Sequence, residues 1–377
     1  AAITEGTVKA KTCSGTRWSP STFKRAHTSG TSKRSITTFG ITTSQSRFGD
    51  PYYFFKHQLL FGVLPGLFLM YIVQKIDYHF WKKFAFLFFA INLVFLILVF
   101  IPGFELNFQG ASRWLKLGSF SFQPSEMLKL ALLLYLAAWL EGKREKGRDF
   151  FEGFVPFLAI LGVVGFLIIK QPDMGTLGVT VLIAMSMYFM SGARFQHLSM
   201  MFGMGVLAFL ALVKFESYRM SRLLVFLHPE LDPRGIGYQI NQALLAIGSG
   251  GLFGLGLGHS RQKFNYLPEP VGDSIFAIIG EEIGLIGAMA LVILFVIFAM
   301  RGLKIAKNAP DTFGKLIAIG ITSWIIFQAL INISAISGLI PLTGVTLPFI
   351  SYGGTSIVFL MIGVGILLNI SKKCEKM

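Results

Sequence analysis

The sequence predicts an all-α fold, a polytopic membrane helix bundle of about nine transmembrane helices, and three observations predict it. Hydrophobic residues make up 53% of the 377 residues and charged residues only 14%, whereas a soluble domain usually carries about 25% charged residues. The apolar residues gather in runs long enough to cross a hydrocarbon core of roughly 30 Å. The charged residues lie in short clusters between these runs.

The first 50 residues differ in composition from the rest. They are rich in Ser, Thr, Lys and Arg and contain no apolar run, so they lack the central region of a signal peptide. We interpret residues 1–50 as a disordered basic tail or a wrongly translated start. Their composition also resembles that of an organellar transit peptide. We expect this tail to contribute nothing to an active site.

Residues 51–377 form the membrane domain. Its apolar runs lie at about 58–75, 83–102, 126–140, 153–170, 175–191, 198–214, 274–300, 315–336 and 353–370. The third run is short. Cys13 and Cys374 are the only cysteines, so the sequence indicates neither a disulfide framework nor a cysteine metal site.

The basic residues predict the orientation of the bundle. A net charge of +15 can indicate a nucleic-acid partner, but here the charges lie in short loops, which is typical of topology determinants. One set of loops carries fifteen Lys and Arg residues, near 75–83, 143–148, 194, 301–315 and 372–376, and the opposite set carries Arg113, Lys116 and Lys170. The first set is therefore expected to be cytoplasmic, and no nucleic-acid partner is predicted.

The loops at 103–125, 215–273 and 337–352 are then expected to face outward. The loop at 215–273 is the longest. Within it, residues 240–257 predict a short interfacial helix or a re-entrant segment. Non-helical backbone at membrane depth requires a covering of protein or a water-filled cavity.

Asp273 lies where this outward loop enters an apolar run, and Glu281 and Glu282 follow within that run. Ionisable groups in or near a bilayer are functional candidates, because they are costly there. The alternative interpretation of Asp273 is a helix N-cap or first-turn acid. The two glutamates lie roughly 12–13 Å deeper, so they need partners, a hydrated cavity or protonation.

Further polar residues lie at the outer ends of other runs. Glu126 and Lys129 can pair on one helix face, as a local ion pair or as ligands. Arg113, next to Trp114, suits an interfacial anchor or a phosphate clamp. Asp173 lies in a polar break that is either a simple loop or part of a site.

Other kinds of site are disfavoured. The glycines between residues 248 and 258 do not fit the dinucleotide motif, so they indicate close packing or an approach to a polar head group. No His/Cys cluster resembles a zinc site. The polar features share the outward face, which suits a lipid-linked anionic substrate.

Five motifs in order resemble the SEDS family of cell-wall polymerases, and together they cover about residues 47–372. They are FQPSEMLKLA at 122–131, QPDMGT at 171–176, YQINQALLAIGSGGLFGLGLGHSRQKFNYLPE at 238–269, IFAIIGEEIG at 275–284 and PLTGVTLPFISYGGTS at 341–356. The segments GLGHSRQKFNYLPE and LPFISYGGTS resemble the division branch of the family, FtsW, more than the elongation branch, RodA.

The resemblance implies ten spans and an activity that polymerises lipid II into glycan strands at the outer face of the bacterial cytoplasmic membrane. It implies that Asp273 is the catalytic aspartate, since it follows LPE and precedes IFA. Pro270, Val271, Gly272 and Ser274 depart from the residues common in relatives. The family's first span would precede residue 47, where this chain has no apolar run, so it is expected to be missing.

Further expectations follow from the resemblance. The residues expected to bind substrate are Arg113, Glu126, Lys129, Asp173, Lys263, Glu269, Glu281 and Ser351. The implied chemistry is an inverting transfer with undecaprenyl pyrophosphate as leaving group. The charge on the pyrophosphate is expected to be stabilised either by Arg113 and Lys129 or by a divalent ion, Mg²⁺ or Mn²⁺, and no organic cofactor is expected. The implied partners are a class B penicillin-binding protein transpeptidase and other divisome membrane proteins. A lipid II flippase and a non-catalytic scaffold are the alternatives.

Overall fold

The structure is a computed structural model that describes residues 56–103, 105–108, 111–117, 120–143, 149–215, 217–232, 235–263 and 266–374. The predicted basic tail at 1–50 lies outside the described residues. All described residues belong to one compact unit, Phe39–Met377.

Within the described residues, each of the nine predicted apolar runs contains a helix, so the all-α membrane bundle is confirmed. The helices are α2 Leu64–Val73, preceded by the π-helical turn Leu59–Val63; α3 Tyr78–Leu98; α4 Pro124–Gly142; α5 Val155–Lys170, preceded by the π-helical turn Phe150–Phe154; α6 Met174–Met190; α7 Phe195–Phe215; α10 Ile275–Lys307; α11 Thr312–Ile336; and α12 Gly354–Cys374. Seven of these segments are long and apolar enough to cross a membrane. The other two are α6, which is shorter, and α4, which carries three charged residues.

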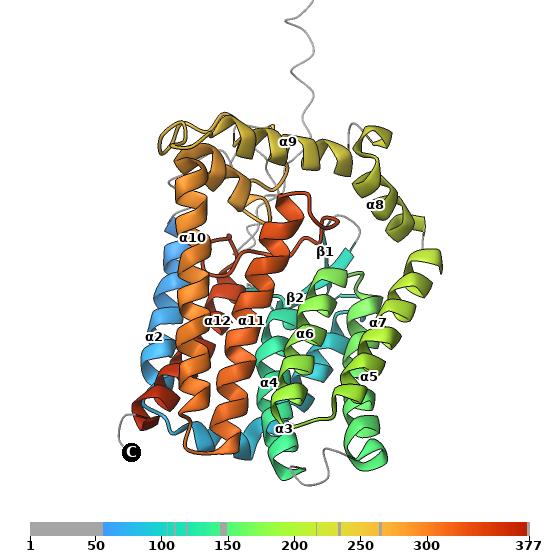
Figure 1. Cartoon of the computed structure of the whole chain (residues 1–377), viewed down its shortest axis with the longest axis vertical. Helices are drawn as coiled ribbons and strands as arrows, with labels where there is room; N and C mark the ends of the chain where they lie inside the picture. Colours follow the sequence, from blue (N-terminus) through green and yellow to red (C-terminus); the bar gives the residue numbers. More distant parts are fainter. Residues whose placement is uncertain are drawn as a thin grey trace, which may run out of the picture. The chain divides into compact units, whose positions relative to one another are not determined.

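Two helices form the centre of the bundle. Almost every residue of α4 from Pro124 to Leu134 is buried, and α11 is the most buried of the candidate spans. Their core side chains include Leu132 and Trp324. The outer helices α3, α7 and α10 instead expose large apolar side chains, because lipid rather than water surrounds such helices. In Figure 1, α11 lies beside α4 and α6, and α10 packs against α11.

A small antiparallel sheet lies within residues 103–125, where the sequence predicted only a loop facing outward. Its strands are β1 Glu105–Phe108, β2 Ala111–Leu117 and β3 Phe120–Phe122, in the order β1-β2-β3. Strands this short give little alternation to detect among long apolar runs. The sheet leaves the fold class unchanged.

The loop at 215–273 forms a cap on one end of the bundle (Figure 1). It contains α8 Ser217–Leu227, a 3-10 turn at Pro229–Leu231, and α9 Ile236–Ser249. The predicted interfacial segment 240–257 is therefore helical in its first part and non-helical after Ser249.

The glycine-rich stretch after α9 lies against a break in α10. Gly284 has φ 72° and ψ −171°, which interrupts the helix. The neighbouring backbone groups bond to the loop instead: Leu285 N donates to Gly251 O at 2.9 Å, Ile286 N to Leu252 O at 3.2 Å, Leu255 N to Glu281 O at 2.9 Å and Gly256 N to Glu282 O at 3.0 Å. Non-helical backbone beside a membrane helix is thus satisfied by protein, as the bilayer requires.

Replacing Gly284 by alanine is expected to lower the melting temperature more than replacing Gly251. Both glycines have positive φ, which costs about 1–3 kcal/mol for other residues. A Cβ on Gly284 would also overlap the backbone of Gly254 and Leu252, whereas a Cβ on Gly251 has open space. Thermal unfolding of both variants in detergent measures the difference. Equal losses would contradict the role of this close contact.

Predicted cytoplasmic segments meet at the other end of the bundle. Asp77 in the α2–α3 turn pairs with Lys373 of α12, and His79 Nε2 lies 2.6 Å from Asp311, which precedes α11. Lys373 and hydrogen bonds to His79 lower the pKa of the Asp77 carboxyl well below its usual range. The two sets of loops predicted to lie on opposite sides are thus at opposite ends.

Candidate active site

Asp273 is the last residue before the helix cap of α10. Ser274 occupies the N-cap position and makes no side-chain cap bond, so Asp273 is not the helix cap considered from the sequence. Its carboxylate is partly buried and accepts a hydrogen bond from Ser274 Oγ at 3.4 Å. A Cβ built on Gly344 would lie 4.0 Å from Asp273 Oδ2, so the α11–α12 loop passes beside the carboxylate.

Two segments far apart in sequence hold the backbone around Asp273. Ser351 Oγ donates to Gly272 O at 2.7 Å and accepts from Leu347 N at 2.7 Å. Tyr352 N donates to Val271 O at 2.8 Å. Ser351, expected to bind substrate, is buried and fastens the loop before α10 to the loop after α11.

The surroundings of Asp273 suit a group that exchanges a proton near neutral pH. Burial, together with the negative charge of Glu269, raises the pKa of Asp273 from 3.8 to about 6. The hydrogen bond from Ser274 and the positive charge of Arg222 oppose this rise. A carboxylate with such a pKa is basic enough to accept a proton and still ionised at pH 7. Glu269 itself is exposed.

Arg222 is a site residue that the sequence reasoning missed. It lies on α8, and its Nη1 donates to Leu342 O at 3.2 Å, two residues before Gly344. The sequence feature that could have indicated Arg222 is its position on an amphipathic segment within the longest loop predicted to face outward. Nothing in the sequence relates that position to Asp273, which lies 51 residues further on.

Glu126 and Lys129 form a buried ion pair on α4. Lys129 Nζ lies 2.8 Å from Glu126 Oε1, and both side chains are almost inaccessible. Lys129 also donates to Gln328 Oε1 at 2.8 Å. Gln328 in turn donates to Thr346 O at 3.0 Å. The predicted pairing is present, and the network reaches the loop beside Asp273; a role in substrate binding stays a prediction.

Arg113 and Asp173 lie close together in the fold but have different partners. Arg113 donates to Gln171 O at 3.2 Å and Pro172 O at 2.5 Å. Asp173 caps α6 by accepting from Thr176 N at 3.0 Å. The start of α6 packs at Gly175 against the α11–α12 loop, at Thr343 and Val345. Both residues therefore lie at the α5–α6 turn, and α6 contacts the α11–α12 loop through Gly175. A role of Arg113 and Asp173 in substrate binding stays a prediction.

Glu281 and Lys263 belong to a second cluster, which holds the glycine-rich loop. Glu281 is buried and accepts from Ser260 Oγ at 2.5 Å and from Arg261 N at 2.9 Å. Lys263 Nζ lies 2.8 Å from Glu282 Oε1. Glu281 and Glu282 can lie inside the apolar α10 segment because both have hydrogen-bond or ion-pair partners in the glycine-rich loop region. The substrate-binding role of Glu281 and Lys263 stays a prediction.

A divalent cation was expected at the site. Among the described residues, no group of three or more His, Cys, Asp or Glu side chains is placed to hold a metal. Mg²⁺ sites completed by substrate phosphates use only one or two carboxylates. The divalent cation therefore stays a prediction.

Comparisons with known proteins agree with this architecture. The chain matches the family described as "Cell cycle protein", with FtsW, RodA and SpoVE as its named members, over residues 35–376. It is 44% identical over 326 residues to stage V sporulation protein E of Bacillus subtilis, covering 86% of this chain and 89% of that protein. It is 39% identical over 349 residues to the probable peptidoglycan glycosyltransferase FtsW of Geobacter sp. strain M18, covering 90% and 94%.

The solved structures that are similar to this chain include two proteins. One is a chain from a study of how a peptidoglycan synthase complex coordinates polymerization and crosslinking, with TM-score 0.73, 27% identity and coverage of 87% of this chain and 92% of that chain. The other is the rod shape determining protein RodA of Thermus thermophilus, with TM-score 0.63, 27% identity and coverage of 86% and 89%. From the matched motifs, the helix bundle and these relatives, the chain belongs to the FtsW/RodA/SpoVE family, the SEDS family, and is FtsW-like.

Proposed function

We propose that this protein is a peptidoglycan glycosyltransferase that polymerises lipid II at the outer face of the bacterial cytoplasmic membrane, with Asp273 as general base. The observation that carries the proposal is the Asp273 carboxylate itself. It is partly buried at the end of a membrane bundle, and its pKa is raised to about 6. The names of the relatives supply the reaction class.

In this mechanism Asp273 removes the proton from the 4-hydroxyl of the acceptor GlcNAc. That oxygen attacks C1 of the donor MurNAc, and the bond from C1 to the pyrophosphate oxygen breaks. Undecaprenyl pyrophosphate leaves with the bonding electrons, and C1 is inverted. The charge that develops on the pyrophosphate calls for a cation. Arg222, whose charge acts on Asp273, joins Arg113 as a candidate within the chain, whereas Lys129 is already paired with Glu126. A divalent ion would supply the same stabilisation.

The distribution of buried charge favours this enzyme over a flippase. The buried Glu126, Lys129, Asp173 and Glu281 lie near the starts of α4, α6 and α10, at the Asp273 end. A transporter needs its polar groups near the bilayer midplane. Purified protein in vesicles with labelled lipid II tests the assignment. Glycan polymer is the expected product; flipping without polymer would favour the flippase, and neither would favour a scaffold.

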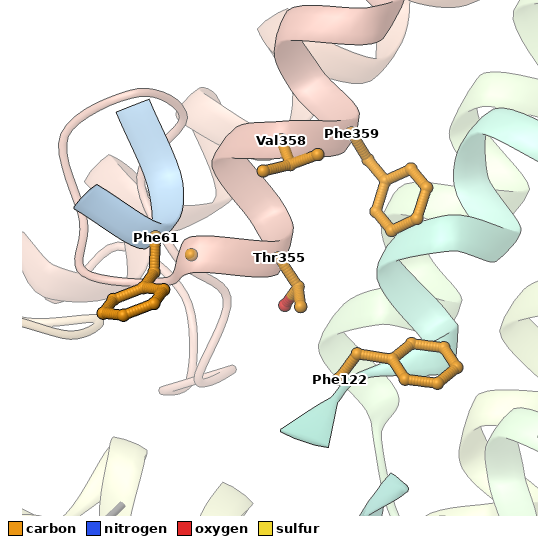
Figure 2. A pocket seen from close by; sticks show the side chains of 6 residues that line it. Phe61, Phe122, Thr355, Val358 and Phe359 are labelled. Carbon is orange, nitrogen blue, oxygen red and sulfur yellow. The ribbon is translucent and has the colours of Figure 1, made fainter. Parts of the chain in front are cut away.

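An apolar groove near the site suits the polyprenyl tail. It has a volume of about 240 Å³ and is lined by Phe61, Phe122, Gly354, Thr355, Val358 and Phe359. Figure 2 shows the five labelled side chains around one space. Gln58 connects this groove to the α11–α12 loop. The Gln58 side chain donates to Ser351 O at 3.2 Å and accepts from Gly353 N at 3.3 Å. A tail in this groove would place its head group towards Asp273.

Filling the groove is expected to weaken substrate binding. Thr355→Trp should raise the KM for lipid II about tenfold, because the indole would occupy the space of the prenyl chain, and should change kcat little. The control is Leu294→Trp, at a side chain of α10 that is 62% exposed. Steady-state kinetics with undecaprenyl and short-chain substrates measure the effect. An equal KM change with both substrates would contradict tail binding here.

The partner and cellular role are part of the same proposal. One structural relative comes from a complex that coordinates polymerization with crosslinking, so we propose a class B penicillin-binding protein as the crosslinking partner, alongside other divisome proteins. The FtsW-like motifs favour cell division. Depletion in the source cell should then give filaments, whereas rounded cells would indicate elongation.

A further inference from the structure

Two buried amides on α11 face the loop that passes beside Asp273. Gln328 and Asn332 are spaced four residues apart, so their side chains lie one turn apart on the same helix face. Both are almost fully buried. Gln328 donates to Thr346 O at 3.0 Å, and Asn332 donates to Val345 O at 2.7 Å. Successive carbonyls of the α11–α12 loop are thus bound to successive turns of α11.

Asn332 also bonds directly to the backbone of Asp273. Its Nδ2 donates to Asp273 O at 2.7 Å as well as to Val345 O at 2.7 Å. One NH₂ group has two hydrogens, so this group is fully used. It fastens the residue that carries the carboxylate to the loop whose Gly344 lies beside that carboxylate.

The other end of this connection is the buried ion pair of α4. Gln328 Oε1 accepts from Lys129 Nζ at 2.8 Å and from Trp324 Nε1 at 2.8 Å. These bonds orient the Gln328 amide, because its oxygen must face Lys129 and its nitrogen must face Thr346. A chain of hydrogen bonds therefore links the α4 ion pair to the backbone of Asp273. It runs through the side-chain amides of Gln328 and Asn332 and the loop residues 345–346 between them.

We infer that Asn332 is a positioning residue for the reaction: it fixes the backbone of Asp273 so that the carboxylate faces the acceptor hydroxyl. The inference rests on the proposed function of Asp273. A general base must lie within hydrogen-bond reach of the proton that it removes. A displacement of about 1 Å can cost on the order of 100-fold in rate. Asn332 contacts the backbone rather than the carboxylate, so it acts through position alone.

The test compares two matched asparagines. Asn369 on α12 is also buried, and its amide also bridges backbone groups, donating to Gln74 O at 2.9 Å and accepting from Tyr78 N at 3.1 Å. It lies at the opposite end of the bundle, in none of the catalytic contacts. Asn332→Leu and Asn369→Leu therefore each remove a buried amide that makes two hydrogen bonds to backbone groups of other segments.

The kinetics of both variants are measured on purified protein with labelled lipid II, per folded molecule. For Asn332→Leu we expect kcat to fall 10- to 100-fold and KM to change less than about twofold, with the acid limb of the pH profile displaced. For Asn369→Leu we expect lower thermal stability and wild-type kcat. A kcat and pH profile in Asn332→Leu equal to those of Asn369→Leu would overturn the inference.

A second variant covers the case in which Asn332→Leu does not fold. Asn332→Gln keeps both donors on a side chain one methylene longer, so it should fold with Asp273 displaced and show reduced kcat at unchanged KM. Wild-type kcat in this variant would overturn the inference. If the wild-type protein itself forms no polymer from lipid II, the proposed function fails instead, so the two failures are distinguishable.

Discussion

Replacing Asp273 by asparagine is expected to reduce lipid II polymerisation at least about 100-fold, the largest effect of any single substitution in this protein. Asparagine has nearly the same shape but cannot accept the proton, and general base catalysis contributes about 10²- to 10⁴-fold. The matched control is Asp311→Asn. Asp311 also precedes a helix, α11, at the opposite end, where it accepts from Gly314 N at 2.6 Å. Unchanged polymerisation in Asp273→Asn would exclude the assigned role.

The pH dependence of kcat/KM reports the same group. Asp273 acts as a base only when ionised, so activity should fall as pH drops through about 6, the pKa to which burial and Glu269 raise it. Because Glu269 contributes to this rise, Glu269→Gln should move the midpoint to lower pH. Because Arg222 opposes the rise, Arg222→Gln should move it to higher pH. A midpoint that neither variant moves would argue against Asp273 as the titrating group.

Asp273→Asn is also expected to stabilise the fold. A loss of activity in this variant would therefore not result from unfolding. The pKa of Asp273 is raised in the folded state, from 3.8 to about 6. Its contribution to stability is therefore fully present below pH 3.8 and is lost as pH rises through about 6. At pH 8 the ionised carboxylate costs at most about 3 kcal/mol, and less after solvent screening. Asp273→Asn should therefore melt at a higher temperature than the wild type at pH 8.

Replacing Lys129 by methionine is expected to cause the largest loss of stability, about 3–5 kcal/mol. Removing one partner of a buried ion pair leaves the other charge uncompensated. Here Glu126 would lose the contact at 2.8 Å while staying buried, and Gln328 Oε1 would lose its bond to Lys129. Because Gln328 also holds Thr346, the loop beside Asp273 should loosen. Thermal unfolding in detergent and the polymerisation rate measure both effects.

Two further variants make the interpretation specific. The double variant Glu126→Gln, Lys129→Met should recover much of the stability, since no buried charge remains. Lys82→Met breaks the pair between Lys82 and Glu141, which has the same charges at 2.6 Å but an exposed lysine, and should cost less than about 1 kcal/mol. If Lys129→Met cost no more than Lys82→Met, the central role of the α4 pair would be wrong.

The helices and the position of Asp273 next to an apolar run were predictable because their signals are local. A span is a run of apolar residues, so nine helices could be placed to within several residues, although α10 extends to Lys307 beyond the predicted 300. Asp273 stood out as an acid next to an apolar run, and the motif resemblance selected it from its neighbours. The sheet, the break at Gly284 and the contribution of Arg222 were not predicted, since each depends on contacts between distant segments.

Glu281 and Asp273 are two acids of one stretch of chain that the fold places in different surroundings. The sequence is enough to show that both are acids near the start of α10, because composition and order along the chain reveal it. Only the folded chain decided their difference. Glu281 accepts bonds from Ser260 and Arg261, so its charge stabilises a loop. Asp273 is fixed through its backbone by Asn332, and burial and Glu269 raise its pKa. An acid's chemistry depends on the donors and charges that other segments bring to it, and these are set by packing.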